Sequence, residues 1–544
     1  MIAERVAARL ALALILLVAL GWRLHNIGFG LPSLYDPDEP IFMITALRML
    51  TEGSLNPGWF GHPGTTTITL LALIDVIIAA WGLASGRYAG IAELSRAAYA
   101  DPALLFVPAR VAMALIGTGC VWLTYGLGKR LHGPATGLVA AALLGVNALH
   151  IAWSQVIRTD IHASLFMLAC LLFAVRIADH GRIRDYLLAG AFAGLATATK
   201  WPAATVFIAV IGAFLFARLQ RSQAGRPPLR WLFAAAGASL VALFIASPFI
   251  FLDWPTMLAN VSGEVKAGHL GHNGAGFLDN LVYYLRGPVG GSIGVIGLVL
   301  VLGGAIVSGV RSPVARWTII PAAFLFLGLI CTQNLIWSRW VLPIMPMICI
   351  FAGVALVSLG QAIAGRLSGA RLAVAIAVLA IVAGAPSLKA AIAGSAERAN
   401  DTRIQAARWA TAHIPAGSRV VFEHLELSLR NRPWQILFPI GDAGCIDGQR
   451  ALRDGIDYDD VQRLRNGRPI VDLGNVSLNR IETCRADFAV LAYYDLYQAE
   501  RALYPAELAT YRRLLAGGRT VALFIPSPGR AGGPVVRVVA LPPR

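Results

Sequence analysis

Long apolar runs are the feature that most constrains what this chain can fold into. An α-helix needs about 20 apolar residues to cross the hydrocarbon core of a bilayer. Eleven runs of roughly this length precede residue 389, the shortest at 185–199. They cover residues 7–27, 104–128, 134–152, 160–178, 185–199, 201–217, 231–250, 288–310, 316–333, 340–360 and 371–388. The sequence, 57% hydrophobic and 14% charged, therefore predicts a polytopic α-helical membrane protein with about 11 transmembrane helices.

A twelfth apolar segment, residues 65–85, is long enough to cross but carries Asp75 at its centre. A carboxylate there costs about 2.5–3.5 kcal/mol when the helix faces lipid. If the segment does not cross, fifteen basic residues of the N-terminus and short loops share one side, and five lie opposite. Basic residues favour the cytoplasmic side. We therefore predict a re-entrant or surface helix at 65–85, within a long first periplasmic loop at 28–103. This distribution also accounts for the net charge of +16 without a nucleic-acid partner.

The composition changes after the last apolar run. Residues 389–544 contain short strand-like runs at 418–422, 486–492, 520–525 and 535–541, which alternate with helical stretches such as 399–413 and 494–516. We therefore predict a transmembrane domain at 1–388 and a periplasmic α/β domain at 389–544. Cys445 and Cys484 are the only cysteines of the second domain. An outer compartment permits a disulfide between them, although the sequence does not show that they come close.

A cluster of carboxylates follows the first apolar run directly, in Tyr35-Asp36-Pro37-Asp38-Glu39-Pro40. Because lipid makes buried charge costly, ionisable groups packed against a span indicate a functional site. The alternative is that Asp38 and Glu39 only cap a helix that opens at Pro40, although a single acid would suffice for that.

The predicted sidedness has a further consequence for charged residues in separate loops. Five of them fall at outer ends of spans, where they could converge on one cavity. They are Asp38, Glu39, Asp160, Lys200 and Arg339. For Asp160 the alternative is a polar residue paired with Arg158, and for Lys200 it is a side chain that reaches to the interface.

Short motifs in a fixed order carry a family resemblance. After the Asp-Glu pair come His62-Pro63-Gly64, Pro108-Ala109-Arg110, Arg158-Thr159-Asp160, Thr197-Ala198-Thr199-Lys200 and Arg339-Trp340-Val341-Leu342-Pro343. Over residues 5–345 the chain resembles the lipid-dependent GT-C glycosyltransferases. The resemblance is to the protein O-mannosyltransferase branch, which includes the bacterial aminoarabinose transferases of lipid A. Two departures are Trp340, where the family usually has tyrosine, and His62-Pro63, which replaces a common Pro-Pro.

The resemblance implies an inner-membrane enzyme that transfers a sugar from a polyprenyl-phosphate donor at the periplasmic face. The acceptor would be a protein, lipid A or a cell-envelope glycan. The family's acidic base maps onto Asp38, with Glu39 beside it. Its second-loop acid maps onto Asp160, and its phosphate-side lysine onto Lys200.

The chemistry of such a transfer calls for the same residue types. A departing polyprenyl phosphate needs fixed cations, and the candidates are Lys200, Arg158, Arg110 and Arg339. An acceptor hydroxyl must lose a proton to a carboxylate, for which Asp38 is our first choice. One base and one leaving group suit a single displacement that inverts the anomeric centre. A retaining route needs a carboxylate nucleophile about 5 Å from the acid/base, and Asp160 keeps that route open.

Metal binding is the main alternative role for the acids. Asp38, Glu39 and Asp160 could hold a divalent cation such as magnesium, but basic residues in the same loops can neutralise phosphate without it. His269 and His272 have a spacing compatible with zinc, yet the glycines around them favour a mobile loop. We therefore assign no metal ligands, although a divalent cation at the acids stays open, and we place His62, His269 and His272 on the acceptor side.

Two functions of other classes remain open at this point. A transporter or flippase of lipid-linked sugars would bind the same headgroups with the same outer charges but without chemistry. A membrane-anchored receptor or assembly factor would act through residues 389–544 and would not depend on Asp38.

Overall fold

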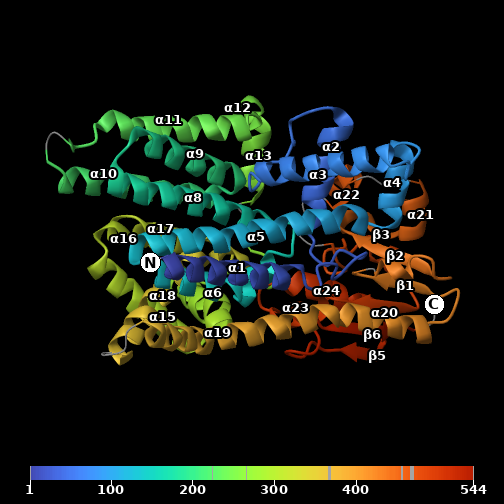
Figure 1. The fold of residues 1–544 in the computed structure, drawn as a ribbon. Coiled ribbons are helices and arrows are strands. Elements are labelled where there is room, and N and C mark those ends of the chain that lie inside the picture. Colours follow the sequence, from blue (N-terminus) through green and yellow to red (C-terminus); the bar gives the residue numbers. More distant parts are fainter. Residues whose placement is uncertain are drawn as a thin grey trace. The chain divides into compact units, whose positions relative to one another are not determined.

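The computed structural model describes residues 2–222, 225–264, 266, 268–364, 369–424, 426–454, 458–465 and 471–542 (Figure 1). Within these residues, ten helical segments are long and apolar enough to cross a membrane. They are Arg5–Leu24, Thr65–Ala84, Ala103–His132, Thr159–His180, Trp201–Gln220, Leu229–Ala246, Phe277–Arg311, Pro313–Cys331, Ser338–Ile363 and Ala370–His413. The predicted class, a polytopic α-helical membrane protein, is confirmed.

The chain divides by its contacts into two compact units. The first contains Met1–Gly28, Asp36–Ala267 and Gly274–Ala391, and the second contains Phe29–Tyr35, Gly268–Asn273 and Ile392–Arg544. The main division falls inside one long helix, α19 (Ala370–Ala399), whereas the sequence places it between residues 388 and 389. The two short segments of the second unit have no signal in the hydropathy pattern.

The first unit is helical. Its helices are α1 Ile2–Leu24, α2 Glu39–Glu52, α3 Thr65–Ala84, α4 Ile91–Ala100, α5 Ala103–His132, α6 Pro134–Gly145, α7 Ala148–Trp153, α8 Thr159–His180, α9 Ile183–Thr199, α10 Phe207–Gln220, α11 Leu229–Ala246, α12 Phe249–Leu252, α13 Trp254–Glu264, α14 Phe277–Tyr284, α15 Gly290–Arg311, α16 Pro313–Trp317, α17 Ile319–Cys331 and α18 Met345–Ala364. Short 3-10 helices cover Trp201–Val206 and Ser338–Ile344.

Two of the eleven predicted runs differ from the rest. The run at 134–152 is broken into α6 and α7, because Asn147 leaves the helix and its side chain caps α7 by accepting a hydrogen bond from the His150 amide. The run at 185–199 is α9, a helix of 17 residues. The segment at Thr65–Ala84 is a single helix, α3, and Asp75 on it is buried rather than exposed. That α3 does not cross the membrane remains a prediction.

Helix α8 lies at the centre of the first unit, packed against α5, α9 and α10 and seen between α9 and α5 in Figure 1. Small residues allow close packing between neighbouring helices. A Cβ placed on Gly190 of α9 would lie 2.0 Å from the Ala235 carbonyl oxygen of α11, and one on Gly194 would lie 2.1 Å from that of Ser239. Such close backbone approach is typical of membrane helices, which lack a hydrophobic drive to associate.

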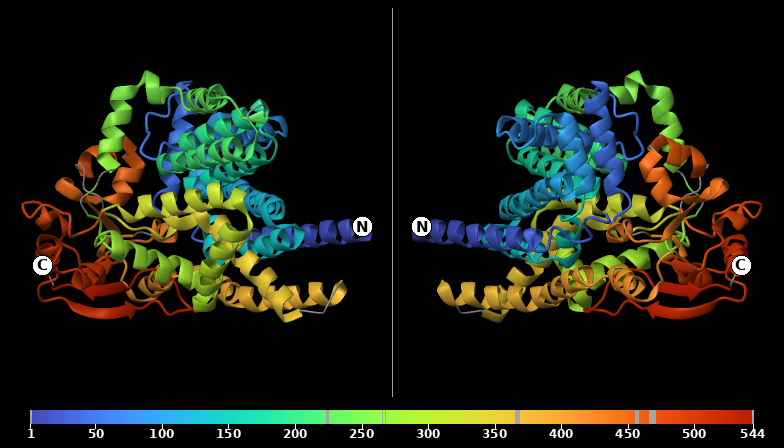
Figure 2. Two further views of the ribbon diagram at one scale, coloured as in Figure 1. Left: turned by 90° about the vertical axis from the view of Figure 1, so that its left-hand side faces the viewer. Right: turned by 90° about the vertical axis from the view of Figure 1, so that its right-hand side faces the viewer.

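The second unit contains a six-stranded sheet with the order β3-β2-β1-β4-β6-β5. The strands are β1 Arg419–Phe422, β2 Gln435–Ile440, β3 Gly444–Asp447, β4 Phe488–Leu491, β5 Arg519–Phe524 and β6 Val536–Ala540. Strand β1 runs parallel to both β2 and β4, and the remaining pairs are antiparallel. The long strands β5 and β6 are the red arrows in Figure 2. Strands β1, β4, β5 and β6 confirm four predicted runs, while β2 and β3 were not predicted.

Alternating apolar residues give this sheet two buried faces. Val420 and Phe422 pack with Ala406 of α20 (Thr402–His413). Val421 between them packs on the other face with Tyr511 of α24 (Pro505–Leu514). The remaining helices are α21 Gly448–Asp454, α22 Tyr458–Arg465 and α23 Tyr494–Ala499. Cys445 and Cys484 form a disulfide, which settles the pairing that the sequence left open.

Candidate active site

The acidic segment lies at the start of α2. Asp38 is the N-cap residue, but its side chain makes no capping hydrogen bond. Instead Asp36 accepts a hydrogen bond from the Asp38 amide at 3.0 Å. Capping alone therefore does not account for the Asp38 carboxylate, whose side chain is 29% exposed.

Glu39, the first residue of α2, forms a buried ion pair with Arg110 of α5. Arg110 donates from Nε to Glu39 Oε1 at 2.9 Å and from Nη2 to Oε2 at 2.6 Å. The Ile157 amide also donates to Oε1 at 2.9 Å, and both charged side chains are fully buried. The sequence offers Glu39 as a catalytic acid and Arg110 as a phosphate ligand. Their mutual pairing instead suits a structural role that holds the start of α2 against α5 and against the loop before α8.

Breaking this pair from one side is expected to destabilise the protein strongly. Arg110→Met leaves the Glu39 carboxylate buried without its counter-ion, which costs about 3–5 kcal/mol. The matched control is Arg130→Met, because Arg130 pairs with Asp179 at 2.9 Å while both side chains are about one-third exposed. That pair is worth about 0–1 kcal/mol. Thermal unfolding in detergent should separate the two variants, and equal melting temperatures would contradict the structural role.

Arg158 connects two carboxylates of the acidic segment. It is the N-cap residue of α8 with an extended backbone, and its side chain is almost fully buried. Its Nη2 lies 2.6 Å from Asp36 Oδ1, and its Nη1 pairs with Asp38. No role for Asp36 is predicted from the sequence. The only signal for it is its place in a run of three carboxylates within four residues.

A second group of charged side chains lies next to Asp36, Asp38 and Arg158. It contains Asp160, Lys200 and Arg339. Lys200 follows α9 and pairs with Asp160 near the start of α8. Arg339, in the 3-10 helix Ser338–Ile344, connects the two groups. Its Nη2 lies 3.6 Å from Asp38 Oδ2, and its Nε lies 3.9 Å from Asp160 Oδ2. The convergence of these distant residues, predicted from sidedness, is present in the structure.

The backbone around Lys200 is held by the His62-Pro63-Gly64 motif. Pro63 and Lys200 form an isolated antiparallel bridge. The Trp201 amide donates to the His62 carbonyl at 2.9 Å, and the Gly64 amide donates to the Thr199 carbonyl at 3.2 Å. Burial, together with the charges of Lys200 and Arg339, lowers the pKa of His62 to about 3, so its ring is neutral at neutral pH. His62 thus lies beside the cluster as an uncharged residue.

Aromatic rings lie against both arginines. The guanidinium carbons of Arg158 and Arg339 lie 5.7 and 5.8 Å from the centroid of the Trp153 ring. Arg339 also lies 4.2 Å from the ring of Trp337. Cation–π contacts hold a guanidinium in place without using its hydrogen-bond donors.

The two histidines of the glycine-rich loop do not belong to the same unit as this cluster. His269 and His272 lie in Gly268–Asn273 of the second unit, with ring centroids 5.5 Å apart. The segment is tied within that unit by Glu500, which accepts from the Gly271 amide and from Asn273 Nδ2, each at 3.1 Å. Among the described residues, no three His, Cys, Asp or Glu side chains are arranged to hold a metal. Mobility of this loop remains a prediction.

The sequence and the fold are similar to those of known proteins. A family model described as dolichyl-phosphate-mannose-protein mannosyltransferase matches residues 104–251, which include Arg110, Arg158, Asp160 and Lys200. A search of curated protein sequences gives no significant match.

Solved structures match the whole chain. ArnT from Cupriavidus metallidurans in the apo state is 14% identical, with 100% of both chains covered and a TM-score of 0.51. The same protein bound to undecaprenyl phosphate is 14% identical over 100% of this chain and 99% of that one, with a TM-score of 0.50. The oligosaccharyltransferase of Archaeoglobus fulgidus is 11% identical over 93% of this chain and 72% of that one, with a TM-score of 0.49.

The chain has the GT-C fold. The resemblance found in the motifs is thereby confirmed at the level of the fold. The family match and the shared fold together indicate a multi-pass membrane glycosyltransferase of the GT-C type. In this fold the cluster of Asp38, Asp160, Lys200 and Arg339 is the candidate active site.

Proposed function

We propose that this protein transfers a sugar from a polyprenyl-phosphate donor to an acceptor at the periplasmic face of the inner membrane. The observation that carries the proposal is a partly exposed carboxylate, Asp38, which pairs with Arg158 and Arg339, while Lys200 pairs with Asp160 in the same cluster. Undecaprenyl phosphate bound to the similarly folded ArnT supports this class of donor. The acceptor is a hydroxyl group of a protein, lipid or glycan.

In the proposed reaction the bond between the sugar C1 and the phosphate oxygen breaks, and a bond forms between C1 and the acceptor oxygen. Asp38 takes the acceptor proton. The ion pairs of Asp38 with Arg158 and Arg339 both involve Oδ2, so we assign the proton transfer to Oδ1. A carboxylate placed in this way contributes about 10²–10⁴-fold to the rate.

The cations serve the leaving group. The donor is a phosphodiester with one negative charge, and its departure as polyprenyl phosphate adds negative charge on the phosphate. Arg339 and Lys200 are held in fixed positions and can stabilise that charge as it develops. In the absence of donor the three cations are balanced by Asp36, Asp38 and Asp160. An incoming phosphate can take over part of these contacts because it presents the same kind of oxygen.

Displacement with inversion is the simpler course for these residues. A retaining mechanism needs Asp160 as a nucleophile. Its side chain is 1% exposed and is paired with Lys200, with Arg339 nearby. A carboxylate enclosed in this way suits the task of positioning Lys200.

The acids fit a divalent cation poorly. Asp36, Asp38 and Asp160 each already pair with a basic side chain, and those positive charges would repel a metal ion. We therefore expect transfer by purified protein to be unchanged after treatment with EDTA. Loss of activity that magnesium restores would contradict this expectation.

Reconstituted protein supplied with a polyprenyl-phosphate sugar distinguishes the transferase from a flippase. A transferase releases free polyprenyl phosphate and, with a suitable acceptor, yields a glycosylated product visible by mass spectrometry. A flippase moves the intact lipid between leaflets and releases neither. Intact donor after long incubation with a range of acceptors, together with its movement across the bilayer, would overturn the proposal.

A further inference from the structure

The segment just before the acidic residues belongs to the second unit. Phe29–Tyr35 groups by its contacts with Ile392–Arg544, while Asp36, the next residue, belongs to the first unit. The peptide bond between Tyr35 and Asp36 therefore joins the C-terminal unit directly to the segment that carries Asp36 and Asp38.

Tyr35 contacts three side chains of the second unit. Its hydroxyl donates to Glu426 Oε1, and the Ser33 hydroxyl donates to Glu426 Oε2 at 2.6 Å. The guanidinium carbon of Arg403 lies 3.8 Å from the centroid of the Tyr35 ring, and His424 meets the ring edge-on at 5.5 Å.

The residues that hold Tyr35 are themselves fixed. Arg403 donates to both oxygens of Asp401 at 2.9 Å, so the guanidinium that lies over the ring has little freedom. Glu426 is buried, and a buried carboxylate is costly unless it is hydrogen-bonded. Its two hydrogen bonds from Ser33 and Tyr35 meet that need, so the segment and Glu426 depend on each other.

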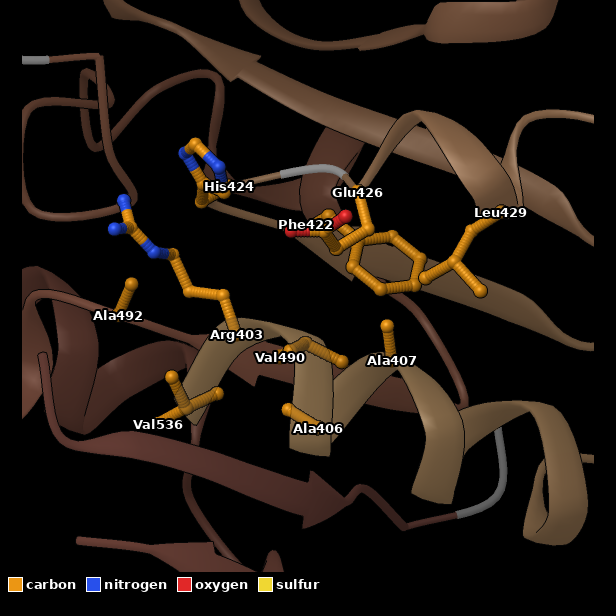
Figure 3. A pocket seen from close by; sticks show the side chains of 10 residues that line it. All are labelled: Arg403, Ala406, Ala407, Phe422, His424, Glu426, Leu429, Val490, Ala492 and Val536. Carbon is orange, nitrogen blue, oxygen red and sulfur yellow. The ribbon is translucent and has the colours of Figure 1, made fainter. Parts of the chain in front are cut away.

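The same side chains line a cavity that is too small for a substrate. Figure 3 shows Arg403 extending from α20 toward His424, with Glu426 on the neighbouring loop. The free volume is about 10 Å³, roughly that of one water molecule. Arg403, His424 and Glu426 each contact Tyr35, which accounts for their gathering here.

We propose that Glu426 is a positioning residue for the active site: by holding Tyr35 and Ser33 it fixes the backbone that enters Asp36 and Asp38. This inference rests on the proposed function. Only one peptide bond and one hydrogen bond separate Tyr35 from Asp38. Tyr35 leads directly to Asp36, which accepts a hydrogen bond from the Asp38 amide at 3.0 Å and pairs with Arg158. A loosened Tyr35 would let this turn move and would misplace the Asp38 carboxylate, and small displacements of a catalytic group lower the rate.

The test uses the full-length protein with Tyr35→Phe, Glu426→Gln and the double variant. Tyr35→Phe removes the donor hydroxyl and keeps the ring between Arg403 and His424. The control is Tyr494→Phe, because the Tyr494 hydroxyl accepts a hydrogen bond from Gln498 in the same unit. Hydrogen exchange at the amides of Asp36, Asp38 and Glu39 reports on the segment without depending on activity.

In both single variants we expect exchange at these amides to rise and kcat to fall, each by about tenfold, which is the effect of losing one charge-assisted hydrogen bond. The KM for the donor should stay unchanged. The double variant should match the single variants, because the two side chains act through one contact. Tyr494→Phe should behave as wild type.

Unchanged exchange at Asp36, Asp38 and Glu39 in both variants would overturn the inference, as would additive losses in the double variant. The measurement also separates the two proposals. If the wild-type protein proves not to be a transferase, faster exchange in the variants still supports the positioning role of Glu426, and unchanged exchange still refutes it.

Discussion

Asp38→Asn is expected to lower kcat by about a thousandfold, because the amide cannot accept the proton of the acceptor hydroxyl. The fold should survive the change. Arg158 keeps its pair with Asp36, and Arg339 remains near Asp160. The donor should therefore bind with little change in KM. Steady-state kinetics of transfer from a polyprenyl-phosphate sugar check kcat and KM. The melting temperature of each variant checks that the fold survives.

The matched control is Asp101→Asn. Asp101 is an exposed acid that follows α4 (Ile91–Ala100) and accepts a hydrogen bond from the Ala103 amide, a task that asparagine can also perform. Its kcat should equal that of wild type. If Asp38→Asn retains full activity, Asp38 is not the base, and the role would pass to another acid.

The second large effect is expected at Lys200. Lys200→Met removes a cation next to the developing phosphate charge, and we expect kcat to fall by about a hundredfold or more. It also leaves Asp160 buried without its partner, since the Asp160 side chain is almost fully enclosed. Breaking a buried pair from one side costs about 3–5 kcal/mol. Lys200→Met should therefore be both inactive and unstable.

A double variant separates these two losses. Asp160→Asn combined with Lys200→Met removes both charges, so the melting temperature should recover much of what the single variant lost. Activity should not recover, because the cation is still missing. Recovery of transfer in the double variant would show that Lys200 acts only as the partner of Asp160. That result would contradict its proposed role at the phosphate.

Part of the candidate site could be predicted from the sequence. Counting basic residues on each side of the predicted spans placed Asp38, Glu39, Asp160, Lys200 and Arg339 at outer ends of spans. The structure brings four of these side chains together, while Glu39 pairs with Arg110 instead. The prediction was possible because charge and span order can be read directly from the chain; the sidedness itself stays a prediction.

The partners within the cluster could not be read in this way. Glu39 is adjacent to Asp38 in sequence, yet it pairs with Arg110, 71 residues away. Asp36, which had no predicted role, forms an ion pair with Arg158 at 2.6 Å. Which carboxylate meets which cation depends on how α2, α5 and α8 are rotated and packed, and hydropathy does not record rotation.

The sequence by itself determined the membrane class, the positions of most spans and four of the six strands, because these follow from local runs of apolar residues and their period. Only the tertiary structure decided that Cys445 meets Cys484, that Glu39 is enclosed by Arg110, and that Phe29–Tyr35 joins the C-terminal unit. These outcomes depend on contacts between residues far apart in the chain. Their free energy comes from burying and pairing specific side chains, which no local pattern encodes.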